Sequence, residues 1–257
     1  MSSNDSIGKT LTVALLLCIV CSVIVSTAAV VLKPAQEYNQ GLDRKRNILA
    51  AAGMLDDSKT VEEQFEQITT RVVDLRTGKF TDAVEPDSYE QLKAAKNPAR
   101  STELDPQEDI ADISRREHFA EVYLVEDDRG NVDKIILPVR GYGLWGTLYG
   151  FIALEGNAQT VAGLGFYEHK ETPGLGGEVD NPRWKNQWPG KQVYRDGEVA
   201  LEVIKGTVDS GAPGAEYKVD GLAGATLTTR GVSNLVQFWL GDNGFAPFIE
   251  NLRAGEA

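Results

Sequence analysis

The chain opens with a long apolar stretch. From Thr10 to Leu32 no charged residue occurs. About 23 residues at about 1.5 Å each span roughly 34 Å, which is enough to cross a bilayer core of about 30 Å. This pattern favours a retained single-span anchor. A cleaved signal peptide is the alternative, because Ser26-Thr27-Ala28 offers small residues where a peptidase could cut.

Two helical segments are expected after the span. Apolar residues recur at helical spacing through residues 37–55, and this pattern stops near Gly53. A second apolar stripe runs through residues 59–75 and predicts another helix. Residues 77–116 are acidic, contain proline and are weakly periodic, so they are expected to form an irregular connector.

The pattern changes to that of β-strands near His118. Strands are predicted at 119–127, 133–143, 147–156 and 160–169, with weaker candidates at 200–206 and around 217–219. Pro138 predicts an edge or a bulge, because proline cannot donate a hydrogen bond to a neighbouring strand. A helix is predicted after Thr226 and ends before Gly241.

Strands followed by a helix predict an α+β fold with a mainly antiparallel sheet. The expected organisation is an N-terminal tail at 1–9, a transmembrane helix at 10–32, a helical and irregular segment at 33–116 that packs on the main domain, and a main domain at 117–257.

Composition narrows the function. A formal net charge of -12 argues against nucleic acid as a partner, because a phosphate-binding surface needs clustered Lys and Arg. Cys18 and Cys21 both lie in the apolar stretch and are interpreted as packing residues. The remainder, with His118 and His169 as its histidines, is a poor candidate for a thiolate-bound cluster, a thiol-linked flavin, a bis-His haem or a zinc site. No metal site is predicted.

Charge around the span points to one orientation only weakly. Four basic residues follow it: Lys33, Arg44, Lys45 and Arg46. The positive-inside rule would keep that side cytoplasmic. Asp5 and Lys9 on the other side give little counterweight, so charge alone leaves the sidedness open.

The segment from Asp220 to Thr229 is the strongest candidate for chemistry. A strand-like run enters it and a helix leaves it, so the first-turn N–H groups and the helix dipole favour an anion there. Gly224 and Ala225 leave room for a phosphate, and Thr226 offers a hydroxyl. The alternative is that Thr226 or Thr228 is simply an N-cap and that the glycines make a turn.

A second candidate lies between Glu168 and Gly176. Pro173-Gly174 and Gly176-Gly177 predict a tight loop whose bare backbone can approach a flat ring closely. An ordinary turn is the alternative interpretation.

At these two segments the chain resembles the covalent FMN-binding domains of the Na+-translocating NADH:quinone reductase and of the related Rnf electron-transport complex. That family carries Asp-Gly-x-x-(Ser/Thr)-Gly-Ala-Thr-x-(Ser/Thr), which falls here on Asp220, Gly221, Gly224, Ala225, Thr226 and Thr228. Ala223 departs from the pattern, where the family usually has Ser or Thr. The departure puts a supporting hydrogen bond in doubt but leaves the acceptor hydroxyl in place.

The resemblance implies a cofactor and its ligands. FMN is expected as a phosphoester on Thr226, made by a flavin transferase. Asp220, Gly224, Ala225 and Thr228 are expected around the attachment point, and Glu171, Thr172, Gly174 and Leu175 are expected to lie along the isoalloxazine. Trp145 is expected to shield one face of the ring, with a core tryptophan as the competing interpretation.

Further matches favour the quinone-reductase protein over its Rnf counterpart: residues 43–49, Ala52-Gly53, 140–145 and 181–188. The resemblance implies an electron relay within a complex of six subunits that oxidises NADH, reduces ubiquinone and exports Na+, in which this chain is neither the NADH site nor the quinone site. No catalytic acid or base is predicted. It also implies a bacterial inner-membrane protein whose soluble domain faces the periplasm, against the charge count. The alternatives are the Rnf protein and a non-redox, membrane-tethered binding module.

Overall fold

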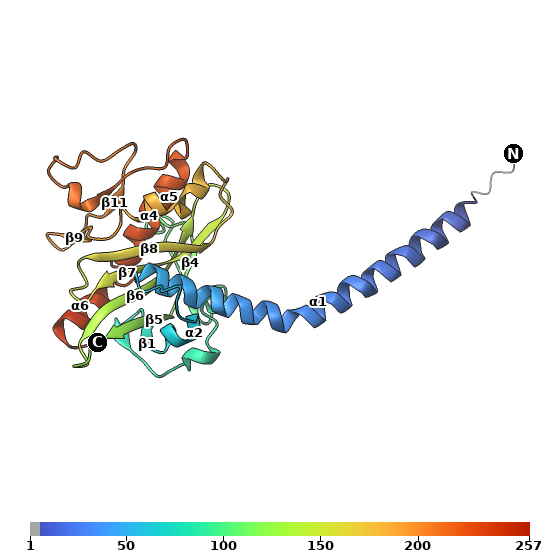
Figure 1. The fold of residues 1–257 in the computed structure, drawn as a ribbon, viewed down its shortest axis with the longest axis horizontal. Coiled ribbons are helices and arrows are strands. Elements are labelled where there is room, and N and C mark those ends of the chain that lie inside the picture. Colours follow the sequence, from blue (N-terminus) through green and yellow to red (C-terminus); the bar gives the residue numbers. More distant parts are fainter. Residues whose placement is uncertain (1–5) are drawn as a thin grey trace. The chain divides into compact units, whose positions relative to one another are not determined.

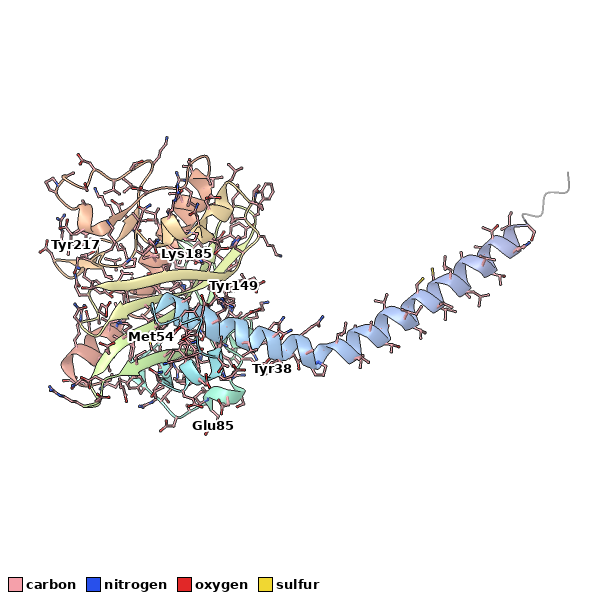
Figure 2. The ribbon with its side chains drawn as sticks, viewed as in Figure 1. Tyr38, Met54, Glu85, Tyr149, Lys185 and Tyr217 are labelled. Atoms are coloured by element: carbon pink, nitrogen blue, oxygen red, sulfur yellow. The ribbon has the colours of Figure 1, made fainter. Side chains whose placement is uncertain are left out.

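The computed structural model describes residues 6–257, and contacts divide the chain into two units between Asp43 and Arg44. Helix α1 runs from Ile7 to Ala51 and continues through Pro34 and through the candidate cleavage residues 26–28. Its length and composition suit a membrane span. Side chains along its apolar part project outward and are exposed (Figure 2). Of the predicted tail, residues 1–5 lie outside the described residues, and 7–9 belong to α1.

The second unit is built on a six-stranded antiparallel sheet in the order β2-β1-β5-β6-β7-β8 (Figure 1). Its strands are β1 (Ile68–Asp74), β2 (Lys79–Phe80), β5 (Phe119–Glu126), β6 (Val132–Tyr142), β7 (Thr147–Glu155) and β8 (Val161–Glu168). The predicted α+β class with a mainly antiparallel sheet is confirmed.

Shorter elements connect and cover this sheet. The helices are α2 (Val61–Phe65), η1 (Pro86–Ser88), α3 (Gln91–Ala95), η2 (Gly176–Asp180), α4 (Pro182–Lys185), η3 (Ala215–Tyr217), α5 (Thr226–Leu240) and α6 (Ala246–Ala254). The small strands are β3 (Ser101–Glu103), β4 (Arg115–Glu117), β9 (Tyr194–Arg195), β10 (Glu198–Val199), β11 (Glu202–Val203) and β12 (Lys218–Val219).

Both faces of the sheet are buried, which explains the continuous apolar runs in its strands. Val122 and Leu124 point into a large core shared with α5 and α6, whereas Tyr123 and Val125 point into a smaller core. Ile48, Leu49 and Ala51 at the end of α1, with Ala52 directly after it, close that smaller core. Figure 1 shows α5 and the last turns of α1 on opposite faces of the sheet.

The helix predicted over residues 59–75 is wrong for most of its length. Thr60 caps the short helix α2 through a reciprocal capping box with Glu63. From Ile68 onward the chain is strand β1, which pairs with β5 over seven residues. The β-branched sequence ITTRVV suits a pleated surface, and pairing with β5 outweighs the apolar spacing that suggested a helix.

The other strand expectations are confirmed, and Pro138 is accommodated in an informative way. Strand β6 lies inside the sheet, yet it pairs with β5 only between Val132 and Ile136. Beyond that point β6 pairs with β7 alone. Pro138 therefore lies where one side of the strand is locally an edge, and its missing N–H costs no ladder bond there.

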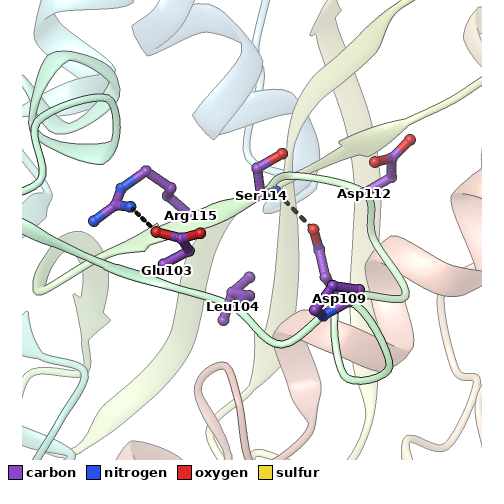
Figure 3. A pocket seen from close by; sticks show the side chains of 7 residues that line it. Glu103, Leu104, Asp109, Asp112, Ser114 and Arg115 are labelled. Atoms are coloured by element: carbon purple, nitrogen blue, oxygen red, sulfur yellow. Dashed lines mark hydrogen bonds and ion pairs between the residues drawn. The ribbon is translucent and has the colours of Figure 1, made fainter.

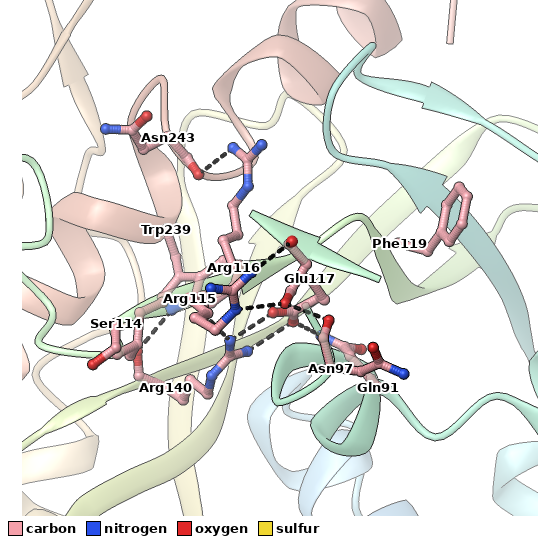
Figure 4. Close-up of polar contacts among 12 residues, drawn as sticks. Gln91, Asn97, Ser114, Arg115, Arg116, Glu117, Phe119, Arg140, Trp239 and Asn243 are labelled. Atoms are coloured by element: carbon pink, nitrogen blue, oxygen red, sulfur yellow. Dashed lines mark hydrogen bonds and ion pairs between the residues drawn. The ribbon is translucent and has the colours of Figure 1, made fainter. Parts of the chain in front are cut away.

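A buried polar network ties β4, β6, α3 and α5 together (Figure 4). Arg140 donates to both oxygens of Glu117, at 2.7 and 2.6 Å. Gln91 Nε2 donates to the same carboxylate at 2.6 Å. The indole N–H of Trp239 on α5 donates to the carbonyl oxygen of Arg140 at 2.7 Å. The network thereby fixes α5 against the end of β6 that leads to residues 143–146.

Candidate flavin site

The N-terminus of α5 carries no side-chain cap. Ala225 is the N-cap residue and makes no side-chain hydrogen bond. The N–H groups of the first helical turn have no partner inside a helix, so they are free to donate to an outside acceptor. Gly224 has a φ of 74°, the left-handed conformation that glycine adopts without strain. The chain thus turns sharply into the helix, and Thr226 is exposed at its first position.

The neighbouring threonines have other partners. Thr228 is buried and donates its hydroxyl hydrogen to Glu171 Oε2 at 2.5 Å. The Thr229 hydroxyl accepts the N–H of Leu222 at 2.9 Å, which fixes the loop before the helix. The interpretation of Thr226 or Thr228 as an N-cap is therefore wrong. Thr226 is the exposed hydroxyl in this stretch, beside helical donors that no side chain caps.

Asp220 holds the loop that enters this turn. Its carboxylate accepts the N–H of Val208 at 2.7 Å, and its carbonyl oxygen accepts the indole N–H of Trp184 at 2.8 Å. Its own N–H donates to Gln187 Oε1 at 3.1 Å. All these contacts are with the protein, so the geometry gives Asp220 a role in shaping the loop.

The loop after β8 lies against the same turn. A Cβ on Gly224 would approach Leu175 Cδ2 to 3.1 Å, so the two loops are in contact. The carbonyl oxygen of Thr172 accepts the N–H groups of Leu175 at 3.1 Å and Gly177 at 2.9 Å, and Gly174 has a φ of 77°. The predicted tight turn is confirmed, and the structure brings the two sequence motifs together.

His169 anchors the start of this loop. Its Nδ1 accepts the N–H of Glu171 at 3.2 Å, so Nε2 carries the hydrogen that points to Asp180 Oδ2 at 2.7 Å. Lys185 reaches the other oxygen of Asp180 at 3.0 Å. The sequence indicated only that this histidine is a poor metal ligand, and its role in the loop was missed because it depends on contacts with η2 and α4.

Exposed apolar side chains gather in the segments around Thr226. Trp145 is 62% exposed, Leu227 is 52% exposed and Leu175 is 45% exposed. The interpretation of Trp145 as a core residue is therefore wrong. Large apolar side chains exposed together are characteristic of a ligand or partner site. Leu144 and Leu227, which the sequence reasoning did not select, belong to the same segments and are also exposed.

A separate pocket of about 460 Å³ lies beside β3 and β4 and contains none of the predicted flavin residues (Figure 3). Three of its charged side chains already have partners within the protein. Asp109 accepts the N–H groups of Ile113 at 3.0 Å and Ser114 at 2.6 Å, and Arg115 donates to Glu103 at 2.9 Å. Within residues 6–257, no group of three or more His, Cys, Asp and Glu side chains could hold a metal ion.

An uncapped helix start with an exposed threonine, a tight glycine loop and exposed apolar side chains together suit a phosphate joined to a flat aromatic ring. The class is that of an FMN-binding domain, and the family model with this description matches residues 143–241. That range includes both loops, Trp145 and all of α5.

Full-length relatives identify the family. The C subunit of the Na(+)-translocating NADH-quinone reductase of Pseudomonas aeruginosa is 56% identical over all of both chains. That of Vibrio alginolyticus is 50% identical over 99% of this chain and 98% of its own. The chain belongs to the family formed by the C subunits of the Na(+)-translocating NADH-quinone reductases.

Solved structures agree. The crystal structure of Shewanella oneidensis NqrC has a TM-score of 0.75 and 36% identity, covering 82% of this chain and 96% of its own. The crystal structure of the corresponding reductase protein from Parabacteroides distasonis has a TM-score of 0.64 and 25% identity, covering 86% and 96%. The predicted resemblance is confirmed, and the chain is an FMN-binding, membrane-anchored part of a larger complex.

Proposed function

We propose that this chain relays electrons through an FMN joined to Thr226 by a phosphoester, within a complex that oxidises NADH, reduces ubiquinone and exports Na+. The names of its relatives favour this complex over the Rnf complex. The observation that carries the proposal is the exposed Thr226 hydroxyl at the uncapped start of α5. A phosphate at this place is stabilised by the helix dipole and by free N–H donors.

The surrounding residues suit the other parts of FMN. Gly224 and Ala225 keep large side chains away from the phosphate, and Gly174 lets backbone approach the ring. Leu175 and Trp145 offer apolar surface to the isoalloxazine. Thr172 shapes the loop through its carbonyl oxygen. Flavin supplies the electron-accepting chemistry, while the protein fixes its position and surroundings.

The covalent bond to FMN and the membrane anchor would both restrict where the flavin lies. A tethered cofactor stays in place when its site is exposed, and its distance to neighbouring redox groups is restricted. Helix α1 would hold the domain at the lipid bilayer beside the other subunits. A flavin transferase is the partner expected for maturation, because the ester joins a protein hydroxyl to a phosphate.

The attachment is tested by denaturing electrophoresis of the chain made beside a flavin transferase. Ultraviolet-excited fluorescence should remain with the wild-type band and should vanish in Thr226→Ala. Thr226→Ser, which keeps a hydroxyl at the same place, should retain some of it. Thr229→Ser is the matched control, because it keeps the hydroxyl that accepts from Leu222 and should fluoresce like wild type. A fluorescent Thr226→Ala band would contradict the attachment site.

The soluble domain is proposed to face the periplasm of a bacterial inner membrane. The basic residues after the span argue for the opposite side, so an experiment must decide. Alkaline phosphatase fused to the C-terminus should be active, since that enzyme folds only in the periplasm. A strongly active cytoplasmic reporter at the same position would refute the orientation without affecting the flavin site.

A further inference from the structure

One buried carboxylate connects the segments on either side of Thr226. Glu171 is 5% exposed. Its Oε1 accepts the N–H groups of Leu144 at 2.9 Å and Trp145 at 3.0 Å. Its Oε2 accepts the hydroxyl hydrogen of Thr228 at 2.5 Å. A single side chain thus joins the turn after β6 to the first turn of α5.

The chain leaves space for this carboxylate on two sides. A Cβ on Gly143 would lie 2.5 Å from Glu171 Oε1. A Cβ on Gly176 would overlap Oε2 and would lie 2.6 Å from the Thr228 hydroxyl. Side chains at either position would displace the carboxylate, so the two glycines form a cradle for Glu171.

Hydrogen bonds, and no cation, hold the carboxylate there. No ion pair of Glu171 occurs among residues 6–257. The backbone N–H of Glu171 donates to His169 Nδ1 at 3.2 Å, which fixes the residue from its other end. Both carboxylate oxygens are directed at protein donors, so the side chain is arranged to hold those donors and not to contact a ligand.

The residue most dependent on this arrangement is Trp145. Its side chain is largely exposed, so packing against the core gives it little support. The turn containing it is closed by the N–H of Gly143 donating to the Gly146 carbonyl oxygen at 2.9 Å. Glu171 adds two hydrogen bonds to the backbone of this turn, from the N–H groups of Leu144 and Trp145. Loss of the acceptor would leave two N–H groups unpaired and free the turn to move.

We propose that Glu171 is a positioning residue that holds the Trp145 turn against α5 and so places the Trp145 indole on the bound flavin. This inference rests on the proposed function, since it requires FMN at Thr226. It replaces the expectation that Glu171 binds the cofactor directly. The carboxylate acts through Trp145 and Thr228.

Flavin fluorescence in the native protein gives a readout of this placement, because an indole in contact with an excited flavin quenches it by electron transfer. The full chain, made beside a flavin transferase, is measured in detergent. Fluorescence is recorded before and after unfolding, and the unfolded signal gives the amount of flavin bound. Quenching is the ratio of the two signals, so a different cofactor load does not alter it.

Glu171→Ala should lose quenching to the level of Trp145→Ala, and the double variant should lose no more than either single variant. Glu171→Gln should restore most of the quenching, because its amide oxygen can accept both N–H groups and its NH2 can donate to Thr228. A purely electrostatic role would instead make Glu171→Gln resemble Glu171→Ala. Glu198→Ala, a change of the same kind at an exposed site on β10, should behave like wild type.

Quenching in Glu171→Ala equal to wild type would overturn the proposal, as would wild-type quenching in Trp145→Ala or failure of a folded Glu171→Gln to rescue. If Glu171→Ala does not fold, Thr228→Val decides, because it removes one of the three bonds. Partial loss of quenching supports the proposal and no loss overturns it. Absence of flavin from unfolded wild-type protein would refute the proposed function instead, so the two failures are distinguishable.

Discussion

Replacing Arg140 with methionine would leave a buried carboxylate without its main partner. Arg140 donates two hydrogen bonds to Glu117, at 2.7 and 2.6 Å. The exposed fraction of Glu117 is 0%, and that of Arg140 is 7%. Burial lowers the pKa of Arg140, but the adjacent Glu117 carboxylate outweighs it and holds the pKa above its ordinary value. The Arg140 guanidinium is therefore charged in the folded protein.

The expected loss of stability is large. Methionine fills a similar volume, but Gln91 becomes the remaining side-chain donor to the Glu117 carboxylate among the described residues. Breaking a buried ion pair from one side costs about 3–5 kcal/mol. A domain of this kind is stable by about 5–15 kcal/mol, so the loss is a substantial part of the total. With a urea dependence of about 2–3 kcal/mol per molar, the unfolding midpoint should fall by about 1–2.5 M.

The assay is urea unfolding of the full chain in detergent, followed by tryptophan fluorescence. Trp239 donates to the Arg140 carbonyl oxygen and lies in the affected core, so its emission reports on this region. Adding Glu117→Gln to Arg140→Met should recover part of the lost stability, because the second change removes the unpaired buried charge.

A matched control uses an ion pair whose arginine is partly exposed to solvent. Arg76 donates to Asp74 at 2.6 Å, and the Arg76 side chain is about half exposed. Arg76→Met should cost less than about 1 kcal/mol, because solvent screens such pairs. If Arg140→Met shifted the midpoint no more than this control, the reasoning that the buried pair fixes α5 on the sheet would be refuted.

Two further predictions concern Gly176 and Tyr167. Gly176→Ala should destabilise the protein by about 1–3 kcal/mol in the same urea assay, because its Cβ would lie 2.6 Å from the Thr228 hydroxyl and would overlap Glu171. A change within experimental error would contradict the cradle for Glu171. Burial raises the pKa of Tyr167 to about 12. The unfolded chain releases this proton near pH 10 and the folded chain does not, so the unfolding free energy should fall between about pH 10 and 12, by at most about 1.4 kcal/mol per pH unit for this residue. Tyr167→Phe should reduce that slope, and an unchanged slope would refute the assignment.

Much of the sheet could be predicted because its strands are signalled locally. Strands β5 to β8 are apolar runs separated by turn residues, and that pattern is independent of distant contacts. Strand β1 could not be predicted in the same way. Its residues fit an apolar helical stripe as well as a strand, and pairing with β5 decides between them. Helix α6 was not predicted either, and it forms where Phe248 and Ile249 meet the core.

The candidate flavin site was likewise predictable only where its signals are local in the sequence. The motif around Thr226 indicated an anion at a helix start, and the glycine loop indicated close approach of a ring. Neither motif showed that Glu171 would join Thr228 to the turn before Trp145, because those contacts cross from one loop to another. The sequence also left open whether Trp145 is a core residue, which the exposure of its side chain answers.

The central claim is that FMN is bonded to the oxygen of Thr226. Mass spectrometry of peptides from chain produced beside its flavin transferase tests it most directly. The account predicts that the peptide containing Thr226 carries an added mass equal to FMN less one water, with fragment ions placing it on that residue. An unmodified Thr226 in protein that retains its flavin, or the same mass on a different residue, would contradict the account.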